Sequence, residues 1–599
     1  MCGIIGYTGL EIAQGKLLTG LKALEYRGYD SCGIATREGV TKTKGRVAFL
    51  EDLLKKSSDI SRVGIGHTRW ATHGEVSTEN AHPHKVGKIT LVHNGIIENY
   101  AEIKAELQTQ GVNFVSETDT EVACALINSY YESTGDIIKA ILQARDNLIG
   151  SYAFAIMVEN EQDKIYAIRY KSPLIVAKAR DGYYLASDMS ALVSFTRKYY
   201  RLNEGEIAEL SPNEIKLHNA KISTPLWEIS NLSIEDTRKQ GYDHYMLKEI
   251  YEQGEVIKNT LAKRIKNSLP SFYEDKLDES YFSDIEEIHI IGCGSAMHAG
   301  LVGKSLIEKY AKIPVSVFVA SEYRYNPPIK NDKALCIFIS QSGETADTLA
   351  SLEYAKNSGY KTLSIVNAQD TSIAREAHNV IYTYAGVEIA VATTKGYTTQ
   401  LAILSLIALR MALDRKTLSC DEIINLTKNL CSVPTAIEGL LRDREKIKTL
   451  AKKIYQRNDI FYIGRGTDYS LCQEGSLKLK EISYINSQAY PAGELKHGTI
   501  SLVTEDTPVI AIANDIKLLP KTISNIKEVK ARGAFTILIT CLPVPVDSAD
   551  YIIKLQTESE IEAIFASIID TQLLSYEVAL LRKCDIDKPR NLAKSVTVE

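Results

Sequence analysis

The chain has 599 residues, which is enough for three or four domains of ordinary size. It is 45% hydrophobic and 24% charged with a net charge of −5, and no run of Lys and Arg points to a nucleic-acid partner. The longest apolar run, residues 401–409, contains a serine and is too short to cross a bilayer, so we expect no membrane association.

The sequence favours a cytoplasmic location. Its N-terminus lacks the basic stretch followed by a long apolar stretch that marks a secretory signal. The ten cysteines include no CxxC pair, which fits reduced thiols better than disulfides.

The chain begins Met1-Cys2-Gly3. A methionine before a small residue is readily removed during synthesis, and its removal would leave the Cys2 thiol beside its own α-amine. Because that amine has a reference pKa of about 7.7–8.0, it could take the thiol proton without a catalytic histidine. The alternative, a cysteine that merely follows the start methionine, is left open by these residues alone.

Two polar loops follow. Residues 26–31 connect a predicted helix to a strand at 32–35, and residues 65–74 bring several polar side chains to one place. Arg69 in the second loop could bind both oxygens of a carboxylate, and Trp70 could form a movable wall. A surface loop with a packed tryptophan is the alternative.

The pair Asn94-Gly95 predicts the turn of a hairpin. The same pair could supply an oxyanion hole, with an amide side chain beside a backbone N–H. Residues 116–121 predict a capped helix start, in which Asp119 could be the cap or could hold an ammonium group.

A metal site is a weaker interpretation of the histidines in this region. His82 and His84 could bind a metal together with His93 or His67. No cysteine pair or acidic ligand has matching spacing, and the Asn- and Pro-containing setting is more typical of a structural loop. We therefore expect no metal.

Taken in order, these motifs resemble class II glutamine amidotransferase domains, which are N-terminal-nucleophile (Ntn) hydrolases with a four-layer α/β/β/α core. The resemblance implies that Cys2 is the nucleophile and that Asn94 and Gly95 form the oxyanion hole. It also implies a glutamine pocket formed by Arg69, Trp70, Thr72, His73 and Asp119.

Residues 217–241 are polar and poor in strand signals, which indicates a linker. Beyond it, apolar residues at helical spacing between Met246 and Ile265 predict one helix. The rest of the chain contains a repeat, because the apolar strand that ends at Gly292-Cys293-Gly294 has a counterpart ending at Gly464-Arg465-Gly466. Strands alternate with helices in both copies, which predicts two doubly wound parallel α/β units.

A dinucleotide site is disfavoured because Met297 and Tyr469 stand where the third glycine of the fingerprint belongs. Residues 340–345 of the first copy are a stronger signal. Their hydroxyls and backbone N–H groups, between a strand and a helix N-terminus, suit a phosphate. An ordinary serine-rich helix cap is the alternative.

The two units resemble the sugar isomerase (SIS) family. Together with the N-terminal domain they are similar to isomerising aminotransferases that use L-glutamine and D-fructose 6-phosphate. The supporting segments are residues 340–345, 391–395, 478–483, 493–498 and 587–599. The domains implied are a glutaminase domain at 2–228, a linker at 229–241, SIS units at 242–420 and 421–583, and a tail at 584–599 that closes the sugar site.

This resemblance implies roles for residues of the second half. The sugar phosphate would be bound by Ser295, Ser340, Gln341, Ser342, Thr345, Val391 and Ala593. His497 would open the sugar ring, Lys594 would form a Schiff base, and Glu481 would move a proton between carbons 1 and 2. Lys478 lies one helical turn before Glu481, and spacing alone favours a solvated ion pair. The resemblance reverses that preference and implies that Lys478 belongs to the catalytic set together with Glu481.

The chain departs from the resembled pattern at one loop, because Ala296 and Met297 stand where a serine and a tyrosine are common. No step needs a metal or an organic cofactor, and a homodimer through the SIS half is implied. Two alternatives remain: another class II amidotransferase, and a sugar-phosphate-binding regulatory protein with an inactive transferase half.

Overall fold

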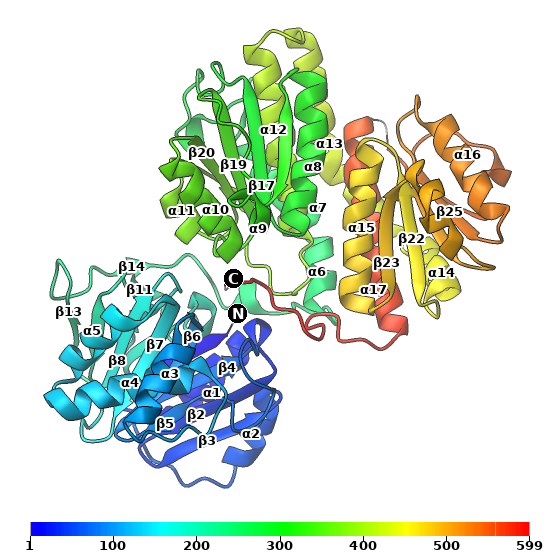
Figure 1. The fold of residues 1–599 in the computed structure, drawn as a ribbon. Helices are drawn as coiled ribbons and strands as arrows, with labels where there is room; N and C mark the ends of the chain where they lie inside the picture. Colours follow the sequence, from blue (N-terminus) through cyan, green and yellow to red (C-terminus); the bar gives the residue numbers. More distant parts are fainter. Residues whose placement is uncertain (1, 370, 558, 598–599) are drawn as a thin grey trace. The chain divides into compact units, whose positions relative to one another are not determined.

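The computed structural model describes the chain except for residues 1, 370, 558 and 598–599. The chain divides into two compact units, which Figure 1 shows in blue to cyan and in green to red. The first comprises Met1–Arg238 with Ala593–Glu599, and the second comprises Lys239–Leu592.

The first unit contains two stacked antiparallel sheets. The eight-stranded sheet has the order β14-β11-β9-β10-β1-β4-β2-β3, and the six-stranded sheet has the order β13-β12-β8-β7-β6-β5. The strands of the first are β1 (Gly3–Gly9), β2 (Ser31–Thr36), β3 (Gly39–Lys44), β4 (Val63–Arg69), β9 (Ile175–Lys178), β10 (Gly182–Ala186), β11 (Lys198–Arg201) and β14 (Glu228–Ile229). Those of the second are β5 (His84–Val86), β6 (Ile89–Ile97), β7 (Gly150–Val158), β8 (Ile165–Tyr170), β12 (Ile207–Leu210) and β13 (Ile215–His218).

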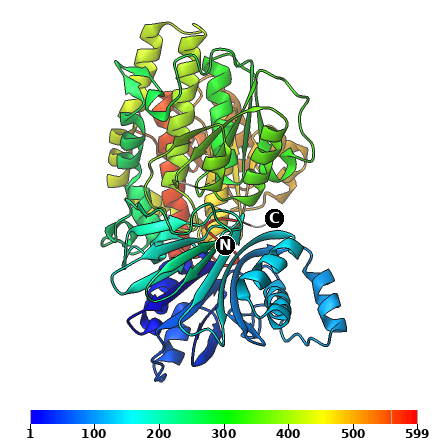
Figure 2. The same cartoon turned by 90° about the vertical axis from the view of Figure 1, so that its left-hand side faces the viewer.

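Helices cover the outer face of each sheet. Helices α1 (Ala13–Leu24) and α2 (Val47–Leu54) pack on the eight-stranded sheet, while α3 (Tyr100–Thr109), α4 (Asp119–Thr134) and α5 (Ile137–Asn147) pack on the six-stranded sheet. Figure 2 shows the light-blue helices α3–α5 on one side of the strands. An apolar layer that includes Ile4, Ile65 and Val92 fills the space between the sheets. The predicted α/β/β/α architecture is therefore confirmed.

The second unit contains two parallel sheets with matching strand orders, β18-β17-β19-β20-β21 and β23-β22-β24-β25-β26. The first is built from β17 (Glu287–Gly292), β18 (Val315–Val319), β19 (Ala334–Ser340), β20 (Lys361–Val366) and β21 (Asn379–Tyr382). The second is built from β22 (Asp459–Gly464), β23 (Asn486–Pro491), β24 (Pro508–Ile512), β25 (Phe535–Thr540) and β26 (Tyr551–Lys554). The predicted repeat of two doubly wound units is confirmed.

The helices of the second unit are α6 (Tyr245–Tyr251), α7 (Gln253–Ala262), α8 (Ser295–Tyr310), α9 (Ala320–Tyr323), α10 (Ala346–Asn357), α11 (Ser372–Glu376), α12 (Lys395–Asp414), α13 (Cys420–Arg442), α14 (Glu445–Ile454), α15 (Thr467–Ser483), α16 (Leu519–Lys530) and α17 (Glu560–Leu581). Gly294 and Gly466 precede α8 and α15 with nearly the same backbone angles, φ 54° and ψ −126° against φ 56° and ψ −130°. Both turns need positive φ, which explains a glycine at each position.

The region between the halves differs from its prediction in two ways. Strand β14 pairs with β11, so ordered structure continues into the start of the predicted linker. The single predicted helix is divided into α6 and α7 at Glu252, whose N–H bonds the carbonyls of Lys248 and Ile250 in a tightened final turn. Ile265 lies outside the helix, in the short hairpin of β15 (Ile265–Lys266) and β16 (Leu269–Pro270).

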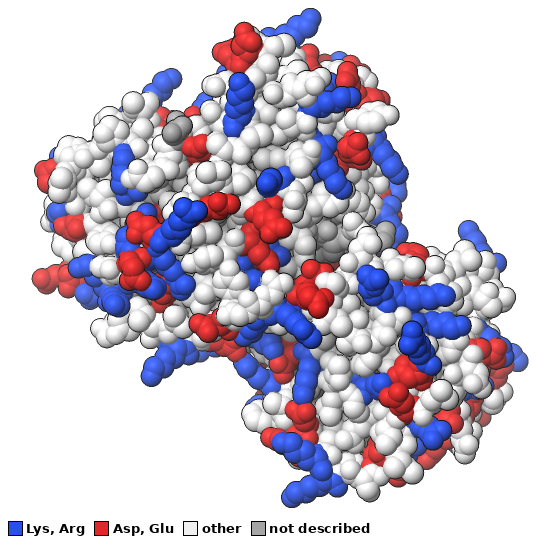
Figure 3. Space-filling model, turned by 180° about the vertical axis from the view of Figure 1, so that it is seen from behind, with Lys and Arg blue, Asp and Glu red and all other residues white. Residues whose placement is uncertain are grey.

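Among the residues that the structure describes, two helices, α12 and α17, are long and apolar enough to span a membrane by composition. In each, 89% of the apolar window is buried inside the protein, which is the behaviour of a core helix. On the face shown in Figure 3, basic and acidic side chains are interspersed rather than gathered into one patch.

Helix α17 carries an unusual buried carboxyl group. Asp570 is fully buried, and neither of its oxygens has a hydrogen-bond partner among the described residues. Burial, the largest influence, raises the pKa of Asp570 to about 7. The folded state therefore favours the neutral form of this side chain.

Replacing Asp570 with Asn should stabilise the protein more at high pH than at low pH. The pKa of Asp570 in the folded state lies above its value of about 3.9 in the unfolded state. The wild-type protein therefore has its full stability below about pH 3.9 with respect to this group and loses part of it as the pH rises toward 7. We expect Asp570→Asn to raise Tm relative to wild type by about 2 °C or more at pH 8, and by less at pH 5. An equal change at both pH values, measured by calorimetry, would contradict this. Asp443→Asn, at a largely exposed neighbour, is the control.

Candidate active sites

Cys2 lies immediately before β1, and strand pairing determines its surroundings. Gly3 pairs with Thr68 of β4, which brings Cys2 level with Arg69 at the end of that strand and within hydrogen-bond distance of Trp70. The Trp70 N–H donates to the Cys2 Sγ at 3.3 Å, and the thiol donates to the Trp70 carbonyl oxygen at 3.5 Å. Burial raises the pKa of the Cys2 thiol, against the opposing effects of the Trp70 N–H and Arg69, so a base must assist its ionisation near neutral pH. The predicted removal of Met1 concerns a residue outside the described part of the chain.

Asn94 and Gly95 lie within β6, so the hairpin-turn interpretation is wrong. They pair with Ala153 and Tyr152 of β7, in the middle of a nine-residue strand. Gly95 has φ +133°, and a Cβ there would lie 1.9 Å from the Ser151 carbonyl oxygen. The glycine thus permits a close approach of two strands rather than a turn. The Asn94 Nδ2 donates to the Cys2 carbonyl oxygen at 3.0 Å, which places this amide next to the candidate nucleophile.

Arg69 is buried at the end of β4 and organises the loop that follows. Its guanidinium donates to the carbonyl oxygens of His73, Gly74 and Glu75. Burial lowers the pKa of Arg69, opposed by nearby acidic groups. Thr72 in this loop is exposed. His73 is half-buried, with its ring edge-on to Tyr100 at 5.3 Å.

The 26–31 loop packs directly against the backbone beside Cys2. A Cβ at Gly28 would lie 2.7 Å from the Trp70 nitrogen, so only glycine allows this contact. The Asp30 carboxylate accepts from the Ala71 N–H at 2.9 Å. These contacts hold the Trp70 segment next to the thiol, and Trp70 itself is partly exposed.

Asp119 is the first residue of α4, and Thr118 is its cap. The Thr118 hydroxyl accepts from the Glu121 N–H at 3.3 Å, which confirms a capped start in this stretch. Asp119 is buried and accepts from the Ile97 N–H at 2.8 Å, so it connects α4 to the end of β6. Its predicted contact with an ammonium group stays a prediction.

The four histidines considered as metal ligands form a packed cluster. The rings of His67 and His82 stack at 4.1 Å, and those of His82 and His84 meet at 5.0 Å. Burial lowers the pKa of His67, His82, His84 and His93, in the case of His67 to about 3. In the described part of the chain no group of three or more His, Cys, Asp or Glu side chains could hold a metal ion.

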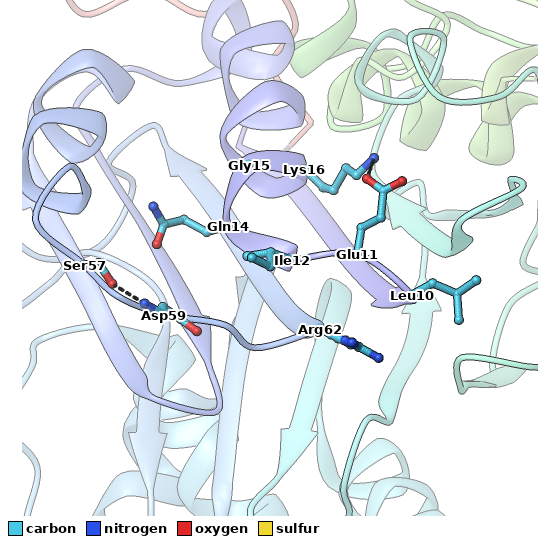
Figure 4. A pocket seen from close by; sticks show the side chains of 9 residues that line it. All are labelled: Leu10, Glu11, Ile12, Gln14, Gly15, Lys16, Ser57, Asp59 and Arg62. Carbon is cyan, nitrogen blue, oxygen red and sulfur yellow. Dashed lines mark hydrogen bonds and ion pairs between the residues drawn. The ribbon is translucent and has the colours of Figure 1, made fainter.

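The first unit also has an open cavity of about 640 Å³, shown in Figure 4. Its lining consists of Leu10, Glu11, Ile12, Gln14, Gly15, Lys16, Ser57, Asp59 and Arg62. Lys16 at its edge is neutralised by Glu11 and Asp181 at 2.7 and 2.6 Å. No predicted site residue lines this cavity.

The 340–345 loop of the second unit joins β19 to α10 in a compact turn. The Ser340 hydroxyl accepts from the Gly343 N–H at 3.0 Å and lies 3.0 Å from the Thr345 hydroxyl. Gly343 has φ +65°, and a Cβ there would lie 2.0 Å from the Thr371 hydroxyl. Thr345 stands at the cap position of α10 without making a side-chain cap bond. Two hydroxyls are therefore held together at a helix N-terminus.

Lys478 and Glu481 do not form a solvated pair. The Lys478 Nζ lies 2.6 Å from Glu481 Oε2 and 3.5 Å from Glu474 Oε1, and the Lys478 and Glu474 side chains are 1% and 0% exposed. Burial alone would lower the pKa of Lys478, but the two carboxylates outweigh it and raise that pKa. The interpretation from spacing was wrong because tertiary packing covers this face of α15.

Glu474, which its sequence context did not single out, also connects the two copies of the repeat. The Ser295 hydroxyl on α8 donates to Glu474 Oε1 at 2.8 Å, and the His298 Nδ1 lies 2.8 Å from Glu474 Oε2. The sequence did contain a sign of this role, because Glu474, Lys478 and Glu481 recur at helical spacing on one face of α15.

In the second copy, Asp468 in the first turn of α15 corresponds in position to Ala296 on α8, and its carboxylate reaches the strand end that corresponds to the 340–345 loop. After β24, the Asn514 N–H and side-chain amide donate to Asp468 at 2.8 and 3.3 Å. Burial raises the pKa of Asp468 to about 6. The backbone N–H groups at the end of β24 are thus already bonded to Asp468 and are not available to a phosphate. The first copy remains as the candidate phosphate site.

The remaining predicted residues are distributed over both units. His497 is exposed in a short 3-10 helix, Glu494–His497. Val391 is buried, and its N–H donates to the Asp587 carbonyl oxygen at 3.0 Å. Ala593 and Lys594 group with the first unit, so closure of the sugar site by the tail stays a prediction.

Removing Glu474 should strongly destabilise the second unit. Glu474→Leu leaves the Lys478 charge buried with one fewer carboxylate, and loss of one partner of a buried pair costs about 3–5 kcal/mol. Glu528→Leu, in the exposed pair with Lys496, should cost less than about 1 kcal/mol. Urea unfolding measures both values, and equal costs would contradict the assignment of Glu474 as a buried structural anion.

Comparison with known proteins agrees with the two-unit architecture. Residues 67–194 match the glutamine amidotransferase domain model, and residues 281–410 and 453–582 match the SIS domain model. A solved structure described as the C-terminal domain of glucosamine-fructose-6-phosphate aminotransferase from Francisella tularensis is 40% identical, with TM-score 0.57, over 58% of this chain and 99% of that chain.

Full-length relatives are also present. The glutamine–fructose-6-phosphate aminotransferases (isomerizing) of Caldanaerobacter subterraneus subsp. tengcongensis and Clostridium tetani are each 47% identical, and the one of Thermus thermophilus is 41% identical. Each alignment covers 100% of this chain and 100% of the relative. Identity of this size over the whole length shows that the chain belongs to the family of glutamine–fructose-6-phosphate aminotransferases (isomerizing), with one glutamine amidotransferase domain and two SIS domains.

Proposed function

We propose that this protein transfers the amide nitrogen of L-glutamine to D-fructose 6-phosphate and isomerises the sugar. The products are L-glutamate and D-glucosamine 6-phosphate, and the reaction is the first step of hexosamine synthesis. The observation that carries the proposal is the position of the Asn94 amide, whose Nδ2 lies 3.0 Å from the carbonyl oxygen of Cys2. Membership of the family supports the choice of substrates.

In the glutaminase half, Cys2 attacks the side-chain amide of glutamine. Removal of Met1 frees the Cys2 α-amine, which takes the thiol proton. The Asn94 side chain and the Gly95 N–H stabilise the oxyanion, ammonia leaves, and water hydrolyses the thioester. Arg69 and Asp119 hold the carboxylate and amine of the substrate in a pocket lined by Trp70, Thr72 and His73.

In the SIS half, the 340–345 loop binds the sugar phosphate through Ser340, Gln341, Ser342 and Thr345, with Ser295, Val391 and Ala593 as further contacts. His497 opens the ring, and Lys594 forms a Schiff base at carbon 2. Glu481 then moves a proton between carbons 1 and 2. The buried Lys478, 2.6 Å from Glu481, holds that carboxylate in place.

We further propose a cytoplasmic homodimer formed through the SIS half. The resemblance implies that His497 reaches into the sugar site of the partner subunit, and the exposed position of His497 is compatible with that role. The proposed domain limits are 2–228, 242–420 and 421–583, with a linker at 229–241 and a tail at 584–599.

Cys2→Ala should separate the two half-reactions. We expect the variant to release no glutamate from glutamine, because the nucleophile is gone, while it still converts fructose 6-phosphate to glucose 6-phosphate. Enzymatic assays of glutamate and glucose 6-phosphate measure the two activities. Cys420→Ala, at an exposed cysteine, is the control and should keep both. Loss of isomerisation in folded Cys2→Ala would contradict the proposal.

Lys594→Arg should block synthesis of glucosamine 6-phosphate while glutamine hydrolysis continues. Arginine keeps the charge but cannot form the imine. Borohydride reduction in the presence of fructose 6-phosphate should label Lys594 in the wild type, as peptide mass spectrometry can establish. Lys588→Arg, in the same tail, is the matched control and should remain active. A label on another lysine would refute the assignment.

A further inference from the structure

His67 connects the two sheets of the first unit at the level of Cys2. It lies on β4, between Ile65 and Arg69 on the same face, and it is fully buried. Ile65 belongs to the apolar layer between the sheets, so this face of β4 is directed toward the six-stranded sheet. The His67 Nε2 there lies 2.9 Å from the His93 carbonyl oxygen and 3.1 Å from the Asn94 Oδ1, both on β6.

These two contacts determine the tautomer of His67. A carbonyl oxygen can only accept a hydrogen bond, so the contact with the His93 oxygen requires the proton to be on Nε2. The same N–H also faces the Asn94 side chain, which must therefore present its oxygen and not its amide nitrogen. An Asn94 amide turned by 180° would oppose two donors.

With its oxygen held by His67, Asn94 directs its Nδ2 toward Cys2, where it donates to the carbonyl oxygen at 3.0 Å. Neither end of the Asn94 amide is then free to exchange. We propose that His67 is a positioning residue for glutamine hydrolysis, which acts by fixing the Asn94 amide with one N–H on the Cys2 carbonyl oxygen and the other available to the oxyanion. This inference rests on the proposed roles of Cys2 and Asn94.

The surroundings of His67 hold its ring in place and keep the proton on Nε2. The ring stacks on His82 at 4.1 Å, which holds its plane, and burial lowers its pKa to about 3. His67 is thus neutral at physiological pH, and the single proton that it carries is the one required on Nε2. His82 itself accepts from the His93 N–H at 3.4 Å and makes no contact with Asn94 among the hydrogen bonds of the described residues.

Substitution of His67 tests the inference through kcat and KM for glutamine. His67→Leu removes the donor, and the loss of a properly aimed oxyanion-hole donor lowers kcat by about 10²-fold or more. KM should change little, because the glutamine carboxylate and amine are held elsewhere. His67→Gln, whose amide N–H can donate to the same oxygens, should recover activity to within about tenfold of wild type. His82→Phe preserves the ring stack and should stay within about twofold.

A double-mutant cycle separates positioning from general damage. If His67 acts through Asn94, adding His67→Leu to Asn94→Ala should lower kcat no further than Asn94→Ala alone. Alkylation of Cys2 by iodoacetamide should proceed at the wild-type rate in His67→Leu, because that reaction does not use the oxyanion hole. The inference would be overturned if the two substitutions lowered kcat independently, so that the double variant lost the product of the two single losses. It would also be overturned if kcat were unchanged in His67→Leu, or if His67→Gln were as slow as His67→Leu.

Failure of the underlying proposal has a different signature. If Cys2→Ala still hydrolyses glutamine, the proposed nucleophile is wrong, and the inference about His67, which rests on it, is wrong as well. If the wild-type activity requires Cys2 and Asn94 but is indifferent to His67, only the positioning role fails.

Discussion

The proposed glutaminase site depends on the burial of β1 at the centre of a sheet. Strand β1 is hydrogen-bonded to β10 on one side and to β4 on the other, and all seven of its residues are buried. A terminal strand would ordinarily fray, but one with partners on both edges cannot. The residue before it, Cys2, is therefore held in register against Trp70, and the thiol has a fixed position although it is near the chain end.

The second constraint is that the site is assembled from both sheets. Cys2 precedes a strand of the eight-stranded sheet, whereas Asn94 and Gly95 lie on the six-stranded sheet. Their spacing depends on the packing of the apolar layer between the sheets, together with polar contacts such as that of His67 with Asn94. Because protein interiors are closely packed, this spacing is not easily changed.

The sequence predicted local features well and long-range ones poorly. The strands and glycine turns of the repeat, the helix start at Asp119 and the order of the motifs were all visible in short stretches. The turn interpretation of the Asn94-Gly95 pair was wrong because the conformation of this pair depends on Tyr152 and Ala153 of β7, far along the chain. Spacing alone favoured a solvated Lys478 for the same reason, since its burial depends on packing that local spacing does not encode. Single histidines such as His67 carry no local sign of the strand opposite them.

The asymmetry of the SIS repeat follows from where carboxylates and hydroxyls are placed. In the second copy, Asp468 already accepts the donors at the end of β24, so an added phosphate would meet a buried acid there. In the first copy, the corresponding strand end carries the hydroxyls of Ser340 and Thr345, 3.0 Å apart, and the carboxylate of Glu344 in the same loop accepts from the Ser372 N–H. Ser295 is occupied by Glu474, and Ala296 has no hydroxyl to add. The loop after β19 must therefore supply most of the phosphate contacts that we propose, which makes the departure at residues 296–297 compatible with an active sugar site.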